Sequence, residues 1–223
     1  MATEKISVVI TAHGEASDLP IILGCLEHQR ININGTHSTA NHGVQWTLGE
    51  RSTHPIETVI TYDGYLQNEP KYRPIAHRIA QADLCTFVDP QGGVGHHTRA
   101  PGIEVATGEW IVLTNSDNYF VSGWLDRLVS HITPETGLIY WDCVNNLWRW
   151  TANGGGAKFP GCRLKRGHID LTCVAVRAEL AKQVKFPWRD YEADYEYISA
   201  CARLCDQKNL SIVHIPEILA VHN

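Results

Sequence analysis

The segment IVLTNSDNYF, residues 111–120, is the first place where residue types and spacing suggest chemistry. Three strand-forming residues run into five consecutive polar ones, among them Asn115, Ser116 and Asp117. Short polar residues after a strand often form an ordinary turn. Carboxylate oxygens at the same place can instead hold a hard divalent cation against a phosphate group. The segment by itself is compatible with both interpretations.

Similar polar clusters follow other strand-forming runs. Residues 11–15 come after the first run, and Asp63-Gly64 comes after the second. Residues 92–99, GGVGHHTR, precede a predicted helix, and a helix start can bind an anion. In a parallel sheet the carboxyl ends of the strands meet at one edge. We therefore expect these clusters to converge on a single crevice.

Strand and helix patterns alternate through the first 130 residues. Short runs rich in branched and aromatic residues predict strands at 6–10, 56–62, 84–88 and 110–114. Apolar residues at helical spacing predict a helix at 19–29, and further helices are predicted at 75–82, at 98–107, where Gly108 closes the helix, and at 124–132. This alternation predicts an α/β fold with a mainly parallel central sheet flanked by helices.

After residue 137 the pattern becomes mixed. Strands are predicted at 137–143, 171–176, 212–215 and 218–221, with a helix at 192–205. The 223 residues suit one domain, divided into a first half at 1–130 and a small mixed C-terminal half at 131–223. Residues 32–54 read as a long polar loop, which in a compact domain is either functional or mobile.

The composition argues against several classes of protein. The hydrophobic content of 43% and charged content of 19% are those of a globular protein, and a net charge of -5 argues against a nucleic-acid partner bound through a broad basic face. No apolar run approaches the roughly eighteen residues of a membrane span, and the first residues do not resemble a signal peptide. The seven cysteines are odd in number and scattered, which predicts reduced thiols in a cytoplasmic protein. Cys201 and Cys205 could clamp zinc, but they lie on an apolar helical stripe that favours packing in the core.

The order of the polar clusters resembles a known family. Residues 7–29, SVVITAHGEASDLPIILGCLEHQ, look like the opening of the inverting GT-A glycosyltransferases of family 2, which use nucleotide sugars. IETVITYDGY resembles the second strand of that family, and TRAPGIEVATGEWIVLTNSDN resembles its helix, strand and Asp-x-Asp motif. ADYEYI and ILAVHN are similar to its Glu-Asp motif and to a strand that ends in a metal-binding histidine. The resemblance covers nearly the whole chain apart from 31–54 and 144–166, and it implies a single GT-A, Rossmann-like domain.

The resemblance implies a divalent metal. Asp117 falls on the metal-binding acid of Asp-x-Asp, and His222 falls on the metal-binding histidine. Mn²⁺ or Mg²⁺ at such a site offsets the charge that develops on the diphosphate leaving group, and an imidazole ligand favours Mn²⁺. Asn115 falls on the first acid of the motif, which in the family commonly contacts the ribose.

Other positions match the part of the family that binds the nucleotide sugar. Asp63 would accept a hydrogen bond from the ring N–H of uracil or thymine, which favours a UDP- or dTDP-linked donor. Arg99, at the start of its helix, would lie near the diphosphate or the base. The remaining donor-side positions are Thr11, Ala12, His13, Glu15 and Ser116.

The resemblance places the catalytic base at Asp194. In an inverting transfer the acceptor hydroxyl attacks C1 of the sugar in one displacement and must lose a proton, which a nearby carboxylate can take. A carboxylate near a helix start can also be a helix cap. Asp190, Glu192 and Glu196 are close enough in sequence to compete for the role.

The acceptor is expected to be a hydroxyl of a glycan or glycoconjugate. Tryptophans of the second half, together with the glycine-rich residues 153–156, could stack on sugar rings, although Trp is more often a core or interface residue. His168 and Asp170 could line the same cleft, and Asp142 ends another predicted strand. The tryptophans concerned are Trp141, Trp148, Trp150 and Trp188.

Two other functions compete with glycosyl transfer. A sugar-nucleotide pyrophosphorylase needs a glycine-rich loop with Arg or Lys after the first strand, and TAHGEASDLP contains neither. A non-catalytic sugar- or nucleotide-binding module is compatible with two departures from the family pattern, because Asn115 replaces an acid and Ala193 replaces the Glu of Glu-Asp. Ala100-Pro101 is a third departure, in place of Asn-Arg.

Overall fold

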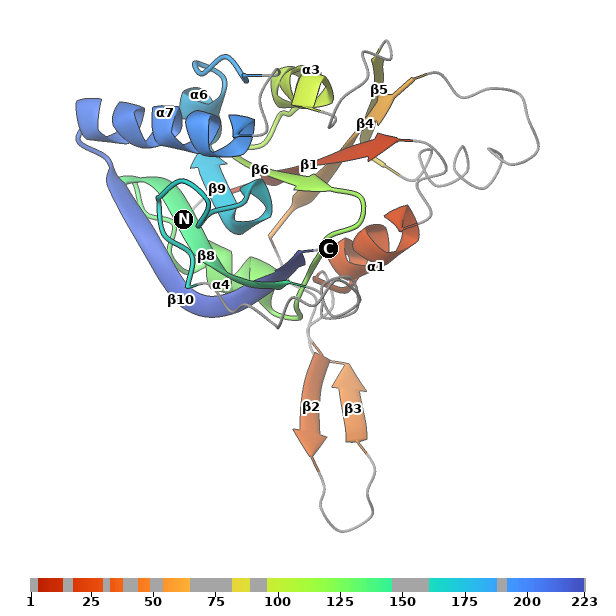
Figure 1. Ribbon diagram of the computed structural model, residues 1–223. Coiled ribbons are helices and arrows are strands. Elements are labelled where there is room, and N and C mark those ends of the chain that lie inside the picture. The colour runs from red at the N-terminus through yellow and green to blue at the C-terminus, as the bar shows by residue number, and fades with distance from the viewer. Residues whose placement is uncertain are drawn as a thin grey trace, which may run out of the picture.

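The computed structural model has an eight-stranded sheet as its main feature, with helices on both faces (Figure 1). The residues that the structure describes are 4–13, 18–29, 33–37, 44–48, 54–64, 82–88, 96–145, 161–187 and 192–222.

Parallel strands make up the first half of the sheet. They are β1 (Ile6–His13), β4 (Ile56–Asp63), β5 (Leu84–Val88) and β6 (Trp110–Asn115). β1 lies between β4 and β6, and β5 pairs with β4 at the edge. The register sets His13 beside Asp63 and Thr11 beside Asn115. The carboxyl ends of three neighbouring strands therefore bring the predicted polar clusters to one edge of the sheet.

The second half of the sheet is mixed. β9 (Val174–Arg177) runs antiparallel to both β6 and β8 (Thr136–Asn145), and so joins the two halves. β10 (Ser211–His222) pairs in parallel with β8, and β7 (Tyr119–Phe120) pairs antiparallel with β10. The predicted mainly parallel sheet with a mixed C-terminal region is confirmed, and one sheet continues through both halves.

The last strand differs from its prediction. The two strands expected at 212–215 and 218–221 are one strand, with register shifts between Ile215 and Ile218 and between Ile218 and Ala220. Pro216 lies within the first of these irregularities. Proline has no N–H to donate to the ladder, so it interrupts the pairing while the backbone stays extended. The strand expected at 171–176 begins later, because η3 (Leu171–Cys173), a 3₁₀ turn, occupies its first three residues.

The expected loop at 32–54 contains an antiparallel strand pair, β2 (Ile33–His37) with β3 (Val44–Leu48). The apolar residues Val44, Trp46 and Leu48 recur at every second position, which is the strand period. The polar composition of the segment obscured this signal. The helix predicted at 75–82 lies almost entirely outside the described residues.

Two hydrophobic cores lie on the two faces of the sheet. In β1, Ile6, Val8 and Ile10 contribute to the first core, whereas Val9 contributes to the second core on the other face. This alternation is expected from the two-residue period of a strand. In Figure 1 the helices lie on two sides of the sheet, below and above it. Those below are α1 (Leu19–Gln29) and α4 (Trp124–Val129), and those above are α3 (Arg99–Val105), α6 (Ala178–Ala181) and α7 (Ala193–Gln207).

Trp141 belongs to the first core, so its predicted acceptor-side role is wrong. Its side chain is fully buried, and its ring packs edge-on against Trp124 with 5.9 Å between centroids. Because side chains alternate between the two faces along β8, the Trp141 side chain points into the core. Neither face of its ring is therefore available to stack on a sugar. Cys201 and Cys205 are also fully buried, on the inner side of α7, as the apolar stripe predicted.

Gly102 allows α3 to lie very close to the sheet. A Cβ atom at this position would lie 2.3 Å from Cγ1 of Val9 and 2.7 Å from Cγ2 of Thr61. No side chain fits there without movement of β1 and β4. This close packing places Arg99, at the start of α3, over the polar end of the sheet.

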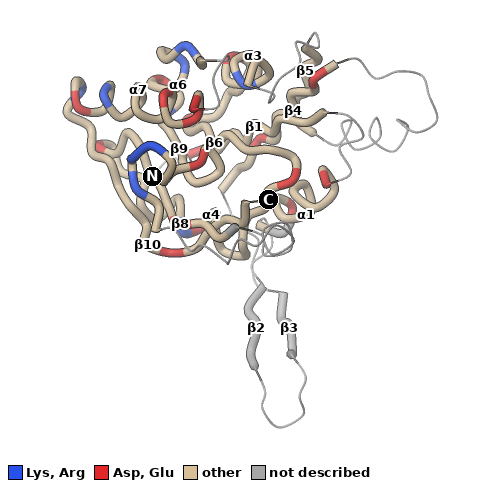
Figure 2. The backbone as a smooth tube through the Cα atoms, viewed as in Figure 1, with Lys and Arg blue, Asp and Glu red and all other residues tan. Residues whose placement is uncertain are grey.

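Charged residues are spread over several elements. In Figure 2 the Lys and Arg residues of the described part occupy separate short segments, among them residues 163–166, and acidic residues occur on several elements. Within the described residues, no helix is both long and apolar enough to cross a membrane.

Candidate active site

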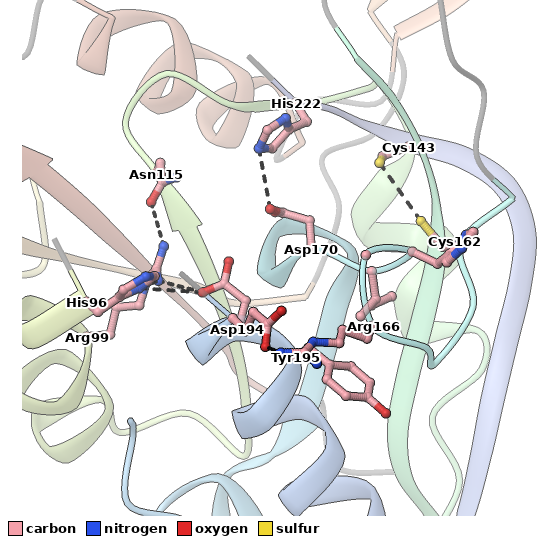
Figure 3. A pocket seen from close by; sticks show the side chains of 14 residues that line it. His96, Arg99, Asn115, Cys143, Cys162, Arg166, Asp170, Asp194, Tyr195 and His222 are labelled. Atoms are coloured by element: carbon pink, nitrogen blue, oxygen red, sulfur yellow. Dashed lines mark hydrogen bonds and ion pairs between the residues drawn. The ribbon is translucent and has the colours of Figure 1, made fainter. Parts of the chain in front are cut away.

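A cavity of about 490 Å³ opens between the end of β6, the end of β10 and the start of α7. Its size is typical of small-molecule sites, which span roughly 300–1,000 Å³. The other contributions come from α3, from the 3₁₀ turn η2 (His96–Thr98) that precedes it, and from residues 162–170 (Figure 3). The side chains that define its chemistry are His96, Arg99, Asn115, Asp170, Asp194 and His222.

Asp194 projects into this cavity from the first turn of α7 (Figure 3). Its side chain is 21% exposed. Burial raises the pKa of Asp194 to about 6; the charge of Arg99 opposes this effect, and the charge of Asp170 adds to it. A carboxylate with such a pKa is mostly ionised at neutral pH yet more basic than an ordinary Asp, which suits a general base.

The other carboxylates near the start of α7 are less suited to the role of base. Glu192 lines the same cavity but pairs with Arg166. Glu196 is exposed on α7, and Asp190 lies outside the described residues. Asp194 is also not the helix cap, because the N-cap residue is Glu192, which makes no side-chain cap hydrogen bond. Ala193 is fully buried in the second core, so a Glu at that position would put a carboxylate among apolar side chains.

Arg99 is buried and connects two of the predicted site residues. One of its terminal nitrogens, Nη1, donates to Oδ1 of Asp194 at 2.7 Å, and Nη2 donates to Oδ1 of Asn115 at 3.0 Å. The guanidinium carbon lies 5.4 Å from the ring centre of Phe186, so a cation–π contact supports the same orientation. Arg99 was predicted near the diphosphate or the base of the nucleotide; in this structure its described contacts are with protein side chains.

His96 completes the group around Arg99. Its Nδ1 accepts a hydrogen bond from Arg99 and lies 3.6 Å from Oδ1 of Asp194. Burial, with the charges of Arg99 and His97, lowers the pKa of His96 to about 4, so the ring is neutral at neutral pH. Because Nδ1 accepts, the proton of the neutral ring is on Nε2. This buried Nε2 has no hydrogen-bond partner among the described groups, which leaves one donor at the cavity wall.

The predicted base-binding residues lie at the neighbouring strand ends. Asp63 ends β4, and its Oδ1 is 3.0 Å from Nε2 of His97. The backbone carbonyl of Thr11 accepts a hydrogen bond from the N–H of Ser116 at 2.9 Å, which ties the end of β1 to the Asp-x-Asp-like turn. Ala12 points into the first core, so only its backbone is available to a ligand. Glu15 lies outside the described residues.

His222 and Asp170 form an ion pair on the opposite wall of the cavity. His222 Nε2 lies 3.3 Å from Oδ2 of Asp170 (Figure 3). The hydrogen bond with Asp170 raises the pKa of His222, and the charges of Asp170, Asp117 and Asp194 act in the same direction. The negative charges of these three carboxylates therefore favour the protonated form of the His222 imidazole.

The remaining predicted acceptor residues separate into two groups. His168 and Asp170 line the cavity. Asp142 is not part of its lining; its Oδ1 accepts a hydrogen bond from the N–H of Cys162 at 2.8 Å and is 2.9 Å from Nε2 of His214. Trp148, Trp150, Trp188 and residues 153–156 lie outside the described residues.

Two features of the site were not predicted individually. The sequence indicates His96 only as part of the segment 92–99, although its spacing of three residues from Arg99 is that of one helical turn. Cys143 and Cys162 also line the cavity, and Cys173 lies beside them. Hydrogen bonding with Cys143 and Cys173 lowers the pKa of Cys162. These cysteines are far apart in sequence, so no spacing rule could bring them together.

The architecture has clear relatives among solved structures. A fragment of TarS from S. aureus, residues 1–349, matches with a TM-score of 0.64 at 14% identity, over 98% of this chain and 60% of that one. The mannosyltransferase PcManGT from Pyrobaculum calidifontis, solved with GDP-Man and Mn²⁺, matches with a TM-score of 0.62 at 17% identity, over 100% of this chain and 57% of that one. The fold is that of a GT-A glycosyltransferase.

The GT-A domain expected from the sequence motifs is therefore confirmed as a fold. TarS 1–349 has also been solved with UDP-GlcNAc and with UDP. The chain spans about three fifths of the length of the TarS fragment and of PcManGT. No protein-family model and no curated protein matches the sequence.

Proposed function

We propose that this GT-A chain is a glycosyltransferase that moves a sugar from a nucleotide diphosphate to a hydroxyl of a glycan or glycoconjugate, with inversion at the anomeric carbon. The observation that carries the proposal is the placement of Asp194, a carboxylate with a raised pKa, in the cavity at the carboxyl edge of this fold. In the proposed reaction the acceptor oxygen forms a bond to C1 as the bond from C1 to the diphosphate oxygen breaks. The hydroxyl proton goes to Asp194.

Arg99 and His96 would hold Asp194 in position for this step. The hydrogen bond from Arg99 fixes one carboxylate oxygen and leaves the other available toward the cavity. The surrounding burial keeps the carboxyl basic despite the positive neighbour, because its pKa stays above that of an ordinary Asp. We assign the donor side to residues 1–130 and the base and acceptor side to residues 131–223, within one domain.

The nucleotide is proposed to be uridine or thymidine. Asp63 lies at the end of β4 beside His13, and the contact of its Oδ1 with His97 orients the carboxylate. The second oxygen, Oδ2, could accept from N3–H of uracil or thymine. Cytosine lacks that N–H, and a guanine would have to present a different edge. Thr11 and Ser116 would border the ribose from the adjoining strand ends.

A divalent cation, Mn²⁺ or Mg²⁺, fits the donors present when the diphosphate supplies further ligands. Asp117 follows β6, His222 ends β10, and the Asp117 carboxylate is close enough for its charge to act on that imidazole. They do not form a closed cage with Asp170, because the described residues hold only one group of three such ligands within 4.8 Å, and it consists of cysteines. One or two protein ligands plus substrate phosphates is a usual arrangement for Mg²⁺. A bound cation would act as a Lewis acid on the departing diphosphate.

The test is a panel of UDP-, dTDP- and GDP-sugars, each with and without Mn²⁺. Thermal shift reports binding, and release of the nucleotide diphosphate reports slow donor hydrolysis or transfer. We expect a shift and turnover with a uridine or thymidine donor, and loss of turnover with retained binding in Asp194→Asn. Asp206→Asn, an exposed change near the end of the same helix, is the matched control. Binding without turnover in the wild-type chain would favour a non-catalytic binding module.

A further inference from the structure

Three buried thiols from separate parts of the chain meet beside the cavity. Cys143 is near the end of β8, Cys162 precedes the turn at residues 163–167, and Cys173 ends η3. Their sulfur atoms all lie within 4.8 Å of one another, and the Cys143 and Cys162 sulfurs are 3.9 Å apart (Figure 3). All three cysteines are free and buried.

The sulfur spacing is close to that of a thiolate metal site. With Zn–S bonds of about 2.3 Å and tetrahedral angles, neighbouring sulfurs are about 3.8 Å apart. A disulfide would need a sulfur separation of roughly 2 Å. The observed 3.9 Å between Cys143 and Cys162 therefore fits two ligands of one ion without a bond between them.

The surroundings hold these sulfurs in place and leave one side accessible. The N–H of Cys162 donates to Oδ1 of Asp142, which also contacts His214, so a second layer of polar contacts fixes this cysteine. Asp170 lies close enough to Cys143 for its negative charge to act on that thiol, which would favour a cation. Cys143 and Cys162 also line the cavity, so an ion bound by the three sulfurs would have its fourth position on that side.

We propose that Cys143, Cys162 and Cys173 bind one Zn²⁺ ion as thiolates, with a water or another cavity ligand in the fourth position. Zinc with soft sulfur ligands is a favoured pairing, and binding would release the thiol protons to solvent. The ion would link β8, η3 and residues 162–170, which form the wall that carries His168 and Asp170. This site is separate from the proposed Mn²⁺ site and does not depend on the proposed reaction.

Cobalt titration of the reduced full chain under anaerobic conditions tests this proposal. Co²⁺ bound by thiolates gives an intense near-ultraviolet charge-transfer band, whereas Co²⁺ bound by carboxylate and imidazole does not. We expect the band to saturate at one equivalent and to disappear when Zn²⁺ is added. Cys143→Ser, Cys162→Ser and Cys173→Ser should each weaken or abolish it. Cys201→Ser, a buried cysteine elsewhere in the fold, and Cys85→Ser, an exposed one, should leave it unchanged.

Alkylation of the folded wild-type chain, counted by intact mass, gives a second readout that needs no variant. Compared with the chelator-treated chain, the Zn²⁺-loaded chain should have three more of its seven thiols protected. The proposal is overturned if folded wild-type protein gives no thiolate band, or if the band is unchanged in Cys162→Ser. It is also overturned if the protection resists the chelator and yields to a reductant, which would identify a disulfide.

Discussion

At the level of single residues, Arg99 and Asn115 explain how Asp194 can be anchored and kept ionised, while burial keeps it basic. Arg99 donates to each of them, and the amide of Asn115 takes one hydrogen bond without taking charge. An Asp at 115 would share the positive charge of Arg99 and repel Asp194 across a buried space. The departure from Asp-x-Asp at this position is therefore consistent with a functional base. Because Asn115 is neutral, the charge of Arg99 is balanced by Asp194 and not shared with a second carboxylate.

The first prediction concerns pH. Once protonated, Asp194 cannot take the proton of the acceptor hydroxyl. Activity should therefore be lost as the pH falls through the Asp194 pKa of about 6, and it should be full above that pH. The pH profile of kcat/KM should show one ionisation near that value on its acid side. A profile that is flat down to pH 4.5 would argue against Asp194 as the base.

Arg99→Gln should move this acid limb to higher pH. The guanidinium charge holds the pKa of Asp194 down, so its removal lets burial raise that pKa further. The pH profile of the variant against wild type measures the shift. Arg203→Gln, an exposed change on the same α7 helix, controls for general loss of positive charge and should leave the limb in place.

Asp117→Ala should remove the stabilisation that a nucleotide gives only in the presence of metal. The reason is that Asp117 would supply a protein carboxylate to a cation that would neutralise charge on the diphosphate. Thermal shift with UDP, measured with and without Mn²⁺, checks this, and Asp206→Ala serves as the surface control. A Mn²⁺-dependent shift of wild-type size in Asp117→Ala would place the metal elsewhere.

At the level of elements, the close approach of α3 to β1 and β4 determines where Arg99 lies. Gly102→Val should destabilise the fold by about 1–3 kcal/mol through overpacking and should lower kcat by moving Arg99. Gly24→Ala in α1, where no atom lies within 4 Å of the added methyl, should instead stabilise by up to about 1 kcal/mol. Urea denaturation measures both, and equal stability of Gly102→Val and wild type would contradict the packing argument.

The elements of the first half could be predicted because the strands are short runs rich in branched residues and α1 has apolar residues at helical spacing. β1, β4, β5 and β6 lie where the sequence predicts strands. The prediction of strands was weaker where the amino-acid composition and the spacing of the apolar residues indicated different structures. Polar residues hid the alternating Val44, Trp46 and Leu48 of β3, and the strands predicted at 212–215 and 218–221 are one continuous β10 that runs through Pro216.

At the level of the whole molecule, the edge of the sheet that carries the site could be predicted, but not the contacts within the site. Parallel strands necessarily bring Thr11, Asp63 and Asn115 to one edge. The pairing of Arg99 with Asp194 joins residues 95 positions apart and depends on how α3 and α7 pack, which no local pattern encodes. The same holds for the cysteine group and for the inward turn of Trp141, because burial is decided by the assembled core.

The most direct test of the central claim is the anomeric configuration of the first product, followed by proton NMR during turnover of an α-linked nucleotide sugar. A single displacement with Asp194 as the base inverts C1, so the account predicts a β-configured product from transfer or slow hydrolysis. Asp194→Asn should slow its appearance by about a hundred- to ten-thousand-fold. An α-configured first product would contradict the account, because retention requires a mechanism other than a single displacement.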